Sequence, residues 1–518
     1  MMTGGIWLLP LFYALAFVAA MMAQRQHWRI AQSGALAALA VVLALSVVDA
    51  GYAVAGQPAL NGVVWIMAVL VALLGWVIVR YSQRYMEGEP DQPRFVRAML
   101  FTLAAVSLLV ASDNLLVMVL AWTATSFGLH YLLTHYRERK AAQIVAHKKF
   151  IVSRMADACL AIALLLVYLA VDSFSLQALS AHLQGVESLS PQLHTAAVLF
   201  ALAAVLKSAQ LPLHGWLIQV MEAPTPVSAL LHAGIVNIGG FVLIRLADLI
   251  ALAPLAQILL VVVGSLTAVL AGLVMLTRIS IKVRLAWSTC AQMGFMLLEI
   301  GLGLYELALL HLVAHSLYKG YAFLSAGDVV SAVRLRDLES ASQPVGLAAL
   351  PRYLISALAV MAIVFTSAWV WQWFLPQLAI PQAALWIVAL GLAPLLWLEH
   401  NASPALFVRG LGQIAGLTQL YFVWHVLFGW MAPAPAEPMT ALVVWVVVCF
   451  IVLYGIQIWL RSHPDGRFSR TFYPWAYNGF YLDESFTRIT FRLWPIRFTA
   501  VQARTLVNGH PNATGEMA

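Results

Sequence analysis

The chain is dominated by long apolar runs, and these runs restrict it to very few folds. Each run is continuous rather than alternating, and about 20 residues is the length of helix that crosses a hydrocarbon layer ~30 Å thick. Within such a layer only helices and closed barrels satisfy all of their backbone hydrogen bonds. The runs therefore predict an all-α polytopic membrane protein.

Composition excludes a soluble protein of the same size. Of the 518 residues, 62% are hydrophobic and 10% are charged, whereas a soluble domain carries roughly 25% charged residues. Cys159, Cys290 and Cys449 lie far apart inside apolar runs, so a disulfide framework, structural zinc and iron–sulfur ligation have no support. We expect no cofactor and no metal site in this chain, and no binding of nucleic acid.

We predict about 14 to 15 transmembrane helices. The apolar N-terminal residues carry no basic region, so we expect them to form a retained first span and not a signal peptide. The segments are 4–23, 31–53, 59–81, 95–112, 114–135, 150–171, 193–221, 225–248, 252–276, 285–303, 305–330, 350–375, 382–400, 403–431 and 439–460.

The loops between these segments sort by charge. Successive loops lie on opposite sides of the membrane, and the loops on one side contain most of the lysines and arginines. On the other side, loops 54–58, 172–192, 376–381 and 432–438 contain none. The positive-inside rule makes the basic set cytoplasmic. We therefore expect a multi-pass protein of the bacterial inner membrane, with a periplasmic N-terminus and a cytoplasmic C-terminus.

Two segments outside the spans are amphipathic. We expect loop 172–192 to form a short piece on the outer surface. The tail after Arg461 is aromatic and basic, and two interpretations stay open: an interfacial anchor on anionic lipid, or a docking arm for a cytoplasmic partner.

Ionisable residues inside spans are expensive and mark functional sites. Arg154 and Asp157 are three positions apart and can pair on one helix face. Lys207 lies in an apolar helix that Pro212 should break just after the lysine. Broken helices expose backbone groups to a cavity, and transporters bind ions at such places. We therefore expect Lys207 to be central to function.

A second polar stripe comes from His311, His315 and Lys319, at i, i+4 and i+8 on one helix face. Three interpretations are a metal site, histidines satisfied within a packed core, and a proton relay. Lysine is a poor metal ligand, and we expect no carboxylate to join the histidines. The relay fits best, because histidine titrates near neutrality and burial disfavours a charged lysine.

The same electrostatics suggest how a proton is moved. A buried lysine tends to be neutral when unpaired and charged when a carboxylate is near. Moving a carboxylate toward or away from Lys207 would therefore load or release a proton.

Long motifs in residues 60–330 resemble the antiporter-like subunits of respiratory complex I and of multi-subunit Mrp cation/proton antiporters. They are YMEGEPDQPRF, SDNLLVMVLAW, QLPLHGW, EAPTPVSALLHAG, IKVRLAWSTCAQMGFM and HLVAHSLYKGYAFLSAG. The resemblance implies two inverted five-helix repeats, each with a broken helix.

The resemblance also implies an organisation of the chain and a set of pathway residues. N-terminal helices would occupy 1–94, a first repeat 95–248, a second, degenerate repeat 249–432, a last transmembrane helix 433–460 and a cytoplasmic amphipathic tail 461–518. Lys207 would be the centre of a half-channel. A connecting polar axis would consist of His232, Lys282, His311, His315 and Lys319, and Arg154 and Asp157 would be the pair of the sixth helix.

The chain departs from the family at two positions. Trp122 is followed by Thr123 where the family has a glutamate that pairs with the lysine of the broken helix. The second broken helix, expected at 365–374, has no ionisable residue where the family has a lysine. We hypothesise that Asp157, or a partner's carboxylate, replaces the glutamate.

The short length and the tail motif at 477–491 are most similar to the DabB-type membrane subunits of bacterial inorganic-carbon accumulation complexes. That resemblance implies a proton- or cation-translocating subunit that is not itself an enzyme. Its DabA-like partner would be a large cytoplasmic zinc protein resembling β-carbonic anhydrase, with the zinc on that partner. The alternative is a pumping subunit of a complex I or Mrp-type assembly. A lysine and histidine axis favours protons, because Na⁺ requires several oxygen ligands.

Overall fold

The computed structural model describes residues 2–23, 25–54, 62–136, 139–327, 350–376, 378, 380–397 and 404–494. In these ranges the regular secondary structure is helical, apart from one isolated bridge between Asn114 and Ser175. Eleven of the described helices are long and apolar enough to cross a membrane. The remaining predicted segments contain two shorter apolar helices, α8 and α18, and two helices with charged residues, α14 and α15. Each predicted transmembrane segment therefore contains a helix or a broken helix.

The N-terminal half contains η1 (Met2–Trp7), α1 (Leu8–Met22), α2 (His27–Val54), α3 (Gly62–Tyr85), α4 (Gln92–Ala111), α5 (Leu115–Leu133), α6 (Lys140–Val171), α7 (Leu176–Leu183), α8 (Pro191–Lys207), α9 (Gly215–Ile218), η2 (Gln219–Glu222), α10 (Thr225–Ala233), η3 (Ile235–Asn237), α11 (Ile238–Arg245) and α12 (Ala247–Ala251). The C-terminal half contains α13 (Pro254–Met275), α14 (Ile281–Gly301), α15 (Tyr305–Leu324), α17 (Leu350–Phe374), α18 (Gln382–Leu392), η5 (Ala393–Leu396), α19 (Pro404–Gly429), α20 (Thr440–Ser462), α21 (Arg467–Tyr477), η6 (Gly479–Tyr481) and α22 (Leu482–Leu493).

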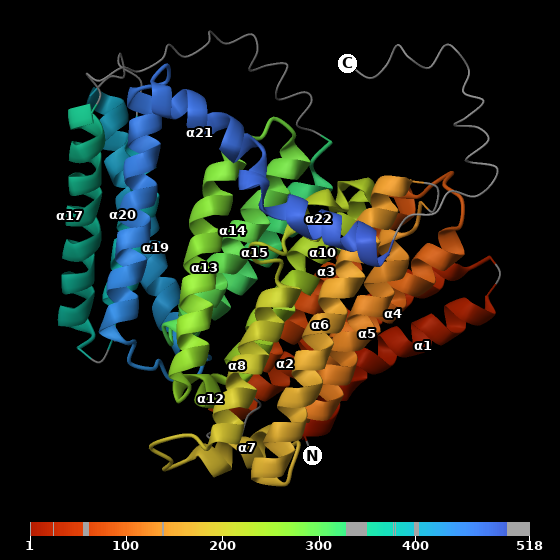
Figure 1. Ribbon diagram of the computed structural model, residues 1–518. Helices are drawn as coiled ribbons and strands as arrows, with labels where there is room; N and C mark the ends of the chain where they lie inside the picture. Colours follow the sequence, from red (N-terminus) through yellow and green to blue (C-terminus); the bar gives the residue numbers. More distant parts are fainter. Residues whose placement is uncertain are drawn as a thin grey trace, which may run out of the picture.

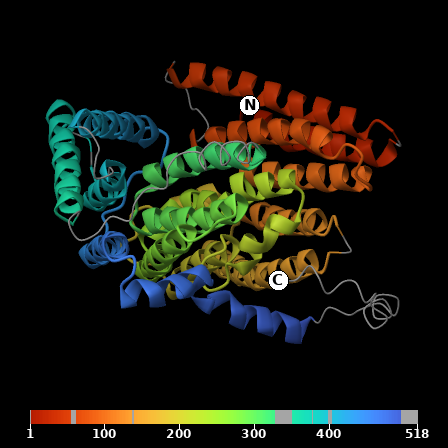
Figure 2. The same ribbon diagram turned by 90° about the horizontal axis from the view of Figure 1, so that it is seen from above.

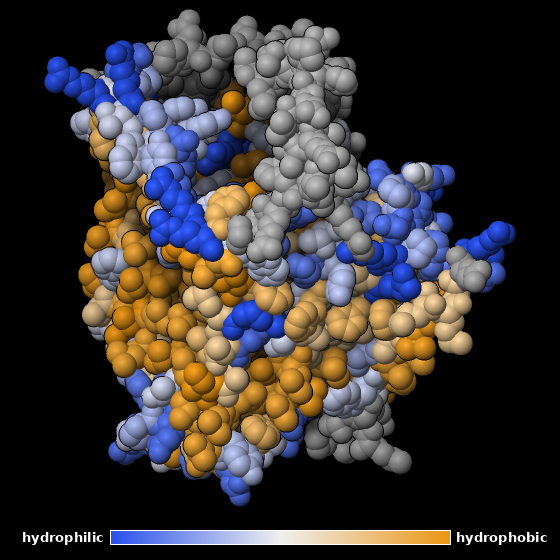
Figure 3. Space-filling model, turned by 45° about the vertical axis from the view of Figure 1, so that its right-hand side comes forward, coloured by the Kyte–Doolittle hydropathy of each residue, from blue (hydrophilic) through white to orange (hydrophobic). Residues whose placement is uncertain are grey.

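The helices form two apolar cores. The larger core joins the helices from α1 to α15, and the smaller one joins α17 to α20 with one side of α13, α14 and α15. Figures 1 and 2 show α17, α19 and α20 as a separate group at one edge of the bundle. In Figure 3 an apolar belt lies between two polar ends. Exposed leucines such as Leu165 and Leu169 on α6 belong to the apolar surface, which is the surface that lipid covers in a membrane protein.

The first predicted helix break is present, and Pro212 explains it. In a continuous helix the carbonyl of Ser208 would accept from the N–H of residue 212, which proline lacks. That carbonyl instead accepts from Gln210 Nε2 at 3.0 Å. The N–H of Leu211 donates to Thr267 Oγ1 of α13 at 3.2 Å. Helix α8 therefore ends at Lys207, and side chains satisfy backbone groups that the break frees.

A second break, which the sequence analysis missed, lies in the next span. Helix α10 ends at Ala233 and α11 begins at Ile238, with Gly234 and η3 between them. Asn237 Nδ2 donates to the carbonyl of Ala233 at 3.1 Å and to Ser316 Oγ on α15 at 2.6 Å. Gly234 and Asn237 were the signals that could have predicted this break.

The break expected in the second repeat is absent from α17. Residues 365–374 lie within α17, which is continuous from Leu350 to Phe374. The expectation of a broken helix there was wrong, and the reason is local. The stretch contains no proline or glycine, so every residue keeps the N–H that continues the helix.

The tail crosses one end of the bundle as two helices (Figure 1). Helix α21 follows α20, and α22 reaches α6, where Lys148 Nζ donates to Asp483 Oδ2 at 2.6 Å. The ring of Trp494 stacks on His147 of α6 with centroids 4.0 Å apart. Figure 1 places α7 and the N-terminus at the opposite end, as an odd number of spans requires. Residues 495–518 of the predicted tail lie outside the described residues.

Candidate cation-translocation site

Lys207 lies at the end of α8, where its side chain is 4% exposed and contacts one carboxylate. Its Nζ donates to Asp157 Oδ1 of α6 at 2.8 Å. Thr123 Oγ1 of α5 donates to the same oxygen at 3.0 Å. The second oxygen, Oδ2, lies 2.6 Å from Arg154, an ion pair one turn earlier on α6. Asp157 is thus in the position that our hypothesis about the missing glutamate requires, although its role as a charge switch stays a prediction.

Thr123 makes a contact that its place in the family motif did not predict. In the family motif this position is a glutamate, and Thr123 lacks its carboxylate. In the structure its hydroxyl occupies part of the space between α5 and α6 and fixes the orientation of Asp157. The preceding Trp122 lies under Lys207, with Nζ 4.9 Å from the ring centroid. An aromatic face stabilises a nearby cation, so the lysine is held between a ring and a carboxylate.

Lys149 is a further buried cation in this region and was missed. It is 5% exposed, its Nζ donates to Ser153 Oγ at 2.5 Å, and it lies 4.8 Å from the ring of Trp216. The predicted span 150–171 begins just after Lys149, whereas the structure extends α6 back to Lys140. The signal was the spacing, since Lys149 lies eight positions before Asp157 on a helix with about 3.6 residues per turn.

This arrangement defines what the cluster can do chemically. Arg154 stays protonated at any physiological pH, so the exchangeable protons belong to the two lysines. Like charges repel strongly where water is excluded, and Asp157 is the carboxylate that contacts both Arg154 and Lys207. A displacement of Asp157 would leave the Lys207 ammonium without its counter-charge in a buried site, which favours release of its proton.

The residues of the predicted polar axis lie in separate hydrogen-bonded pairs, not in one continuous chain. His232 Nδ1 is 3.0 Å from Thr289 Oγ1 of α14, and its ring stacks on Phe323. Lys319 Nζ donates to the carbonyl of Leu285 at 2.9 Å and also to Ser288. These three helices, α10, α14 and α15, bring His232 and Lys319 into one buried polar region.

The histidine stripe of α15 continues this region. Both ring nitrogens of His315 are buried and have no hydrogen-bond partner among the described residues. His311 lies one turn earlier, with ring centroids 6.3 Å apart. Its Nδ1 is 3.0 Å from Glu299 Oε2 of α14. The expectation that no carboxylate joins the stripe was therefore wrong, because α14 packs beside α15 and supplies one.

The grouping of possible metal ligands around these histidines is sparse in the described part of the chain. Across the residues that the structure describes, no three His, Cys, Asp or Glu side chains are grouped so that they could hold a metal ion. Glu299 and His311 provide only two such ligands, whereas structural zinc sites use four.

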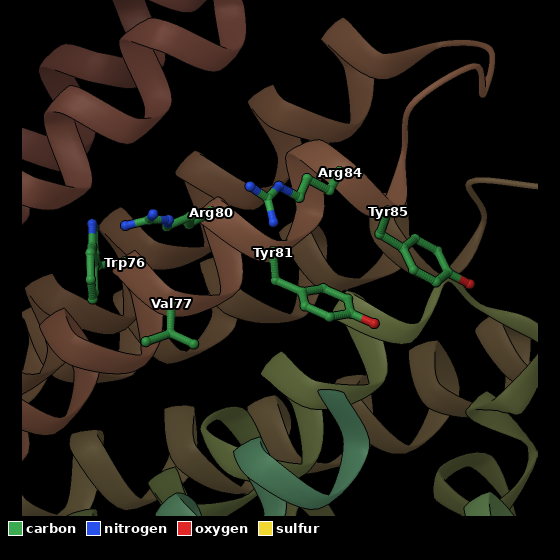
Figure 4. Close-up of a pocket in the computed structure, with 6 residues that line it drawn as sticks. All are labelled: Trp76, Val77, Arg80, Tyr81, Arg84 and Tyr85. Atoms are coloured by element: carbon green, nitrogen blue, oxygen red, sulfur yellow. The ribbon is translucent and has the colours of Figure 1, made fainter. Parts of the chain in front are cut away.

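Lys282, the remaining axis residue, lies near the end of the bundle that carries the tail. Its Nζ donates to Thr225 Oγ1 at 2.9 Å, and Thr225 donates to the hydroxyl of Tyr85 at 3.3 Å. Tyr85 lines a cavity of about 570 Å³ along α3. Figure 4 shows Tyr81 and Tyr85 on one side of this cavity and the side chains of Arg80 and Arg84 turned to the other. Lys282 is thus linked to a surface pocket rather than to Lys207.

Comparison with known proteins assigns the family. The family described as "NADH:quinone oxidoreductase/Mrp antiporter, TM" matches residues 111–387. A second model, described as "NADH-Ubiquinone oxidoreductase (complex I), chain 5 N-terminus", matches residues 58–96. The chain belongs to this antiporter-like family. It is accordingly a membrane subunit that translocates cations.

Curated relatives extend the similarity over most of the chain. One is the "Probable inorganic carbon transporter subunit DabB" of Hydrogenovibrio crunogenus, 42% identical over 83% of this chain and 82% of the relative. Another is "Probable inorganic carbon transporter subunit DabB2" of Halothiobacillus neapolitanus, 38% identical over 97% of this chain and 90% of the relative. The antiporter-like fold is shared with a solved Mrp complex from Dietzia sp. at a TM-score of 0.54 and 20% identity, covering 96% of this chain and 58% of that one.

Proposed function

We propose that this antiporter-like chain is the proton-translocating membrane subunit of an energy-coupled inorganic-carbon accumulation complex. The similarity to two curated inorganic carbon transporter subunits, at 42% and 38% identity, supports this assignment. The observation that carries the translocation step is the contact of Lys207 with Asp157 at the end of broken helix α8. It brings a removable proton and the carboxylate that controls it into one site.

The mechanism we propose uses residues of this chain only. With Asp157 against Lys207, the ammonium is stabilised and the site is loaded. When α6 moves Asp157 away, the Lys207 ammonium loses its counter-charge and releases the proton to the buried polar region around His232 and Lys319. Thr123 of α5 and Arg154 of α6 orient the Asp157 carboxylate. A movement of α6 relative to α8 changes the distance between Asp157 Oδ1 and Lys207 Nζ.

The partner we propose is a large cytoplasmic zinc protein resembling β-carbonic anhydrase, which hydrates CO₂ to bicarbonate and a proton. Zinc would belong to that partner. The tail is the proposed docking surface, because Tyr473, Trp475 and Tyr481 on α21 and η6 are about half exposed. We place the tail in the cytoplasm on the strength of the loop charges, an orientation in which the N-terminus is periplasmic. Contact with anionic lipid is compatible with the same surface.

The alternative is a pumping subunit of a complex I or Mrp-type assembly. The fold shared with the Mrp complex is compatible with it. Two features count against it: Thr123 in place of the fifth-helix glutamate, and the unbroken stretch 365–374 of α17, which has no ionisable residue. Purification through a tag on this chain separates the two proposals. We expect a single large soluble subunit with bound zinc, measured by elemental analysis, and not a set of other membrane subunits.

The functional test is growth in air of a bacterial host that lacks carbonic anhydrase. Co-expression of this chain with its partner should restore growth, and Lys207→Ala should abolish the rescue while the complex still assembles. Arg409→Ala is the matched control, because Arg409 is an exposed cation on α19. Normal growth in air of the Lys207→Ala strain would contradict the proposal.

A further inference from the structure

Glu306 is a buried carboxylate that the mechanism above does not use. It lies in the first turn of α15 and is 3% exposed. Neither of its oxygens accepts a hydrogen bond from any described residue. Burial of an ionised carboxylate without hydrogen bonds is strongly unfavourable. A carboxylate buried in this way is therefore either protonated or retained for a function.

The side chain of Glu306 lines a cavity of about 290 Å³. His425 of α19 lines the same cavity, is 4% exposed, and its Nδ1 lies 3.8 Å from Glu306 Oε1. The ring of Tyr421 stacks on His425 from one turn earlier, with centroids 6.0 Å apart. The cavity also reaches Trp430, which is 83% exposed. A pair of titratable groups therefore lies between the protein interior and the surface.

The cavity lies at the end of the bundle opposite the tail. Residues Pro433 and Pro435, between α19 and α20, form part of its wall. Helix α20 begins beside this loop and is followed by α21. The cavity and the tail therefore lie at opposite ends of α20. The loops at this end lack lysine and arginine, which makes it the outer end in the orientation proposed above.

A second carboxylate and histidine pair continues from the cavity into the bundle. Glu299 lies two residues before the end of α14, close enough to Glu306 for their charges to interact. It contacts His311 at 3.0 Å, and His311 is followed by His315 one turn further into α15. The groups facing Glu306 are thus Glu299 from α14 and His425 and Tyr421 from α19.

We propose that Glu306 and His425 form the outer proton-binding site of this chain, with Glu299 and His311 as the link to His315. A proton from water binds one oxygen of the Glu306 carboxylate and leaves by the reverse step, and no other reactant is needed. A proton fits better than Na⁺, because a hard cation requires several oxygen ligands and the described residues that line the cavity offer one carboxylate and one imidazole. The site would replace the lysine that α17 lacks in 365–374.

This inference rests on the cation-translocating part of the proposed function and not on the role in inorganic-carbon uptake. The test is proton flux into proteoliposomes that contain the purified complex, followed with a pH-sensitive dye. Glu306→Gln keeps the size of the side chain and removes its proton. We expect flux to fall by about 100-fold, the lower end of what a positioned acid or base contributes. Glu437→Gln is the matched control, because Glu437 is an exposed carboxylate at the same end of the bundle.

A chemical readout keeps the inference testable if the variant does not assemble. A carbodiimide applied to the outer face of the wild-type complex should modify Glu306, as detected by peptide mass spectrometry, and should block flux. Wild-type flux in an assembled Glu306→Gln complex, or flux that survives modification of Glu306, would overturn the inference. If the wild-type complex moves protons through Glu306 but does not restore growth in air, the proposed function fails and this inference stands.

Discussion

Replacement of Asp157 by asparagine tests the centre of the mechanism, because it removes the carboxylate and preserves the shape of the side chain. At 2.8 Å and an effective dielectric constant of about 20, Coulomb's law gives roughly 6 kcal/mol of attraction between Lys207 and Asp157. Much of this offsets the desolvation of the two charges. Removal of one partner from a buried ion pair therefore destabilises the remaining charge by about 3–5 kcal/mol.

For the pair of Lys207 and Asp157 we expect a destabilisation of about 3 kcal/mol, the lower end of that range. Asp157 and Arg154 are 16% and 32% exposed, so water screens part of the interaction. About 3 kcal/mol corresponds to roughly a 100-fold change in an equilibrium constant. We expect Asp157→Asn to reduce the population of charged, loaded Lys207, and with it proton flux in proteoliposomes, by about that factor. Asp172→Asn is the control, because Asp172 is an exposed carboxylate at the end of the same helix.

A second substitution distinguishes loss of the charge from damage to the fold. Thr123 Oγ1 lies 3.0 Å from Asp157 Oδ1, so a glutamate at 123 places a carboxylate beside Lys207 from α5. The double variant Asp157→Asn/Thr123→Glu should recover most of the flux. Full flux in Asp157→Asn alone would refute the reasoning, since Lys207 would then need no contacting carboxylate.

Two further predictions concern the break and the tail. Gln210→Leu removes the side chain that donates a hydrogen bond to the buried carbonyl of Ser208. An unsatisfied buried carbonyl costs about 1–3 kcal/mol, so the thermal unfolding temperature of this variant should fall. The control is Gln192→Leu at an exposed position, which should leave the unfolding temperature unchanged. A Cβ at Gly215 would collide with the carboxylate of Asp483, so Gly215→Ala should undock α22. A loss of about 1.4 kcal/mol raises the undocked population tenfold, and trypsin should cleave after Arg488 and Arg492 of α22 correspondingly faster. The control Gly455→Ala meets open space, and equal cleavage of both variants would contradict the proposed docking.

The sequence was sufficient for the features that depend on local chemistry. Apolar runs predicted the helices, and a proline five residues after Lys207 predicted the end of α8, because both effects act within one or two turns. The pairing of Arg154 with Asp157 followed from helix periodicity alone, and the structure confirms that contact. The break expected at 365–374 came from the resemblance to the family, whereas the local sequence there contains no proline or glycine and forms a continuous helix.

Contacts between distant helices were not predictable in this way. Lys148 and Asp483 are 335 positions apart, and their ion pair depends on the path of α21 and α22 across the bundle. Glu299 lies near the end of an apolar helix, where a carboxylate is equally compatible with exposure to water. Its contact with His311 is visible only once α14 and α15 are packed together. Periodicity shows which residues share a face but not which face of another helix they meet.

The two departures from the family have one electrostatic explanation. In the first half, the carboxylate that faces the lysine is supplied by α6 instead of α5, and Arg154 on the same helix moves with it. In the second half, α17 contributes no charge over 365–374, and carboxylate–histidine pairs at Glu306 and Glu299 lie nearby instead. A lysine requires a large change in its surroundings before it releases a proton near neutral pH, whereas a histidine titrates there with small changes. In the mechanism that we propose, the first half therefore requires a moving carboxylate, and the second half exchanges protons with the outer solution while its helices stay in place.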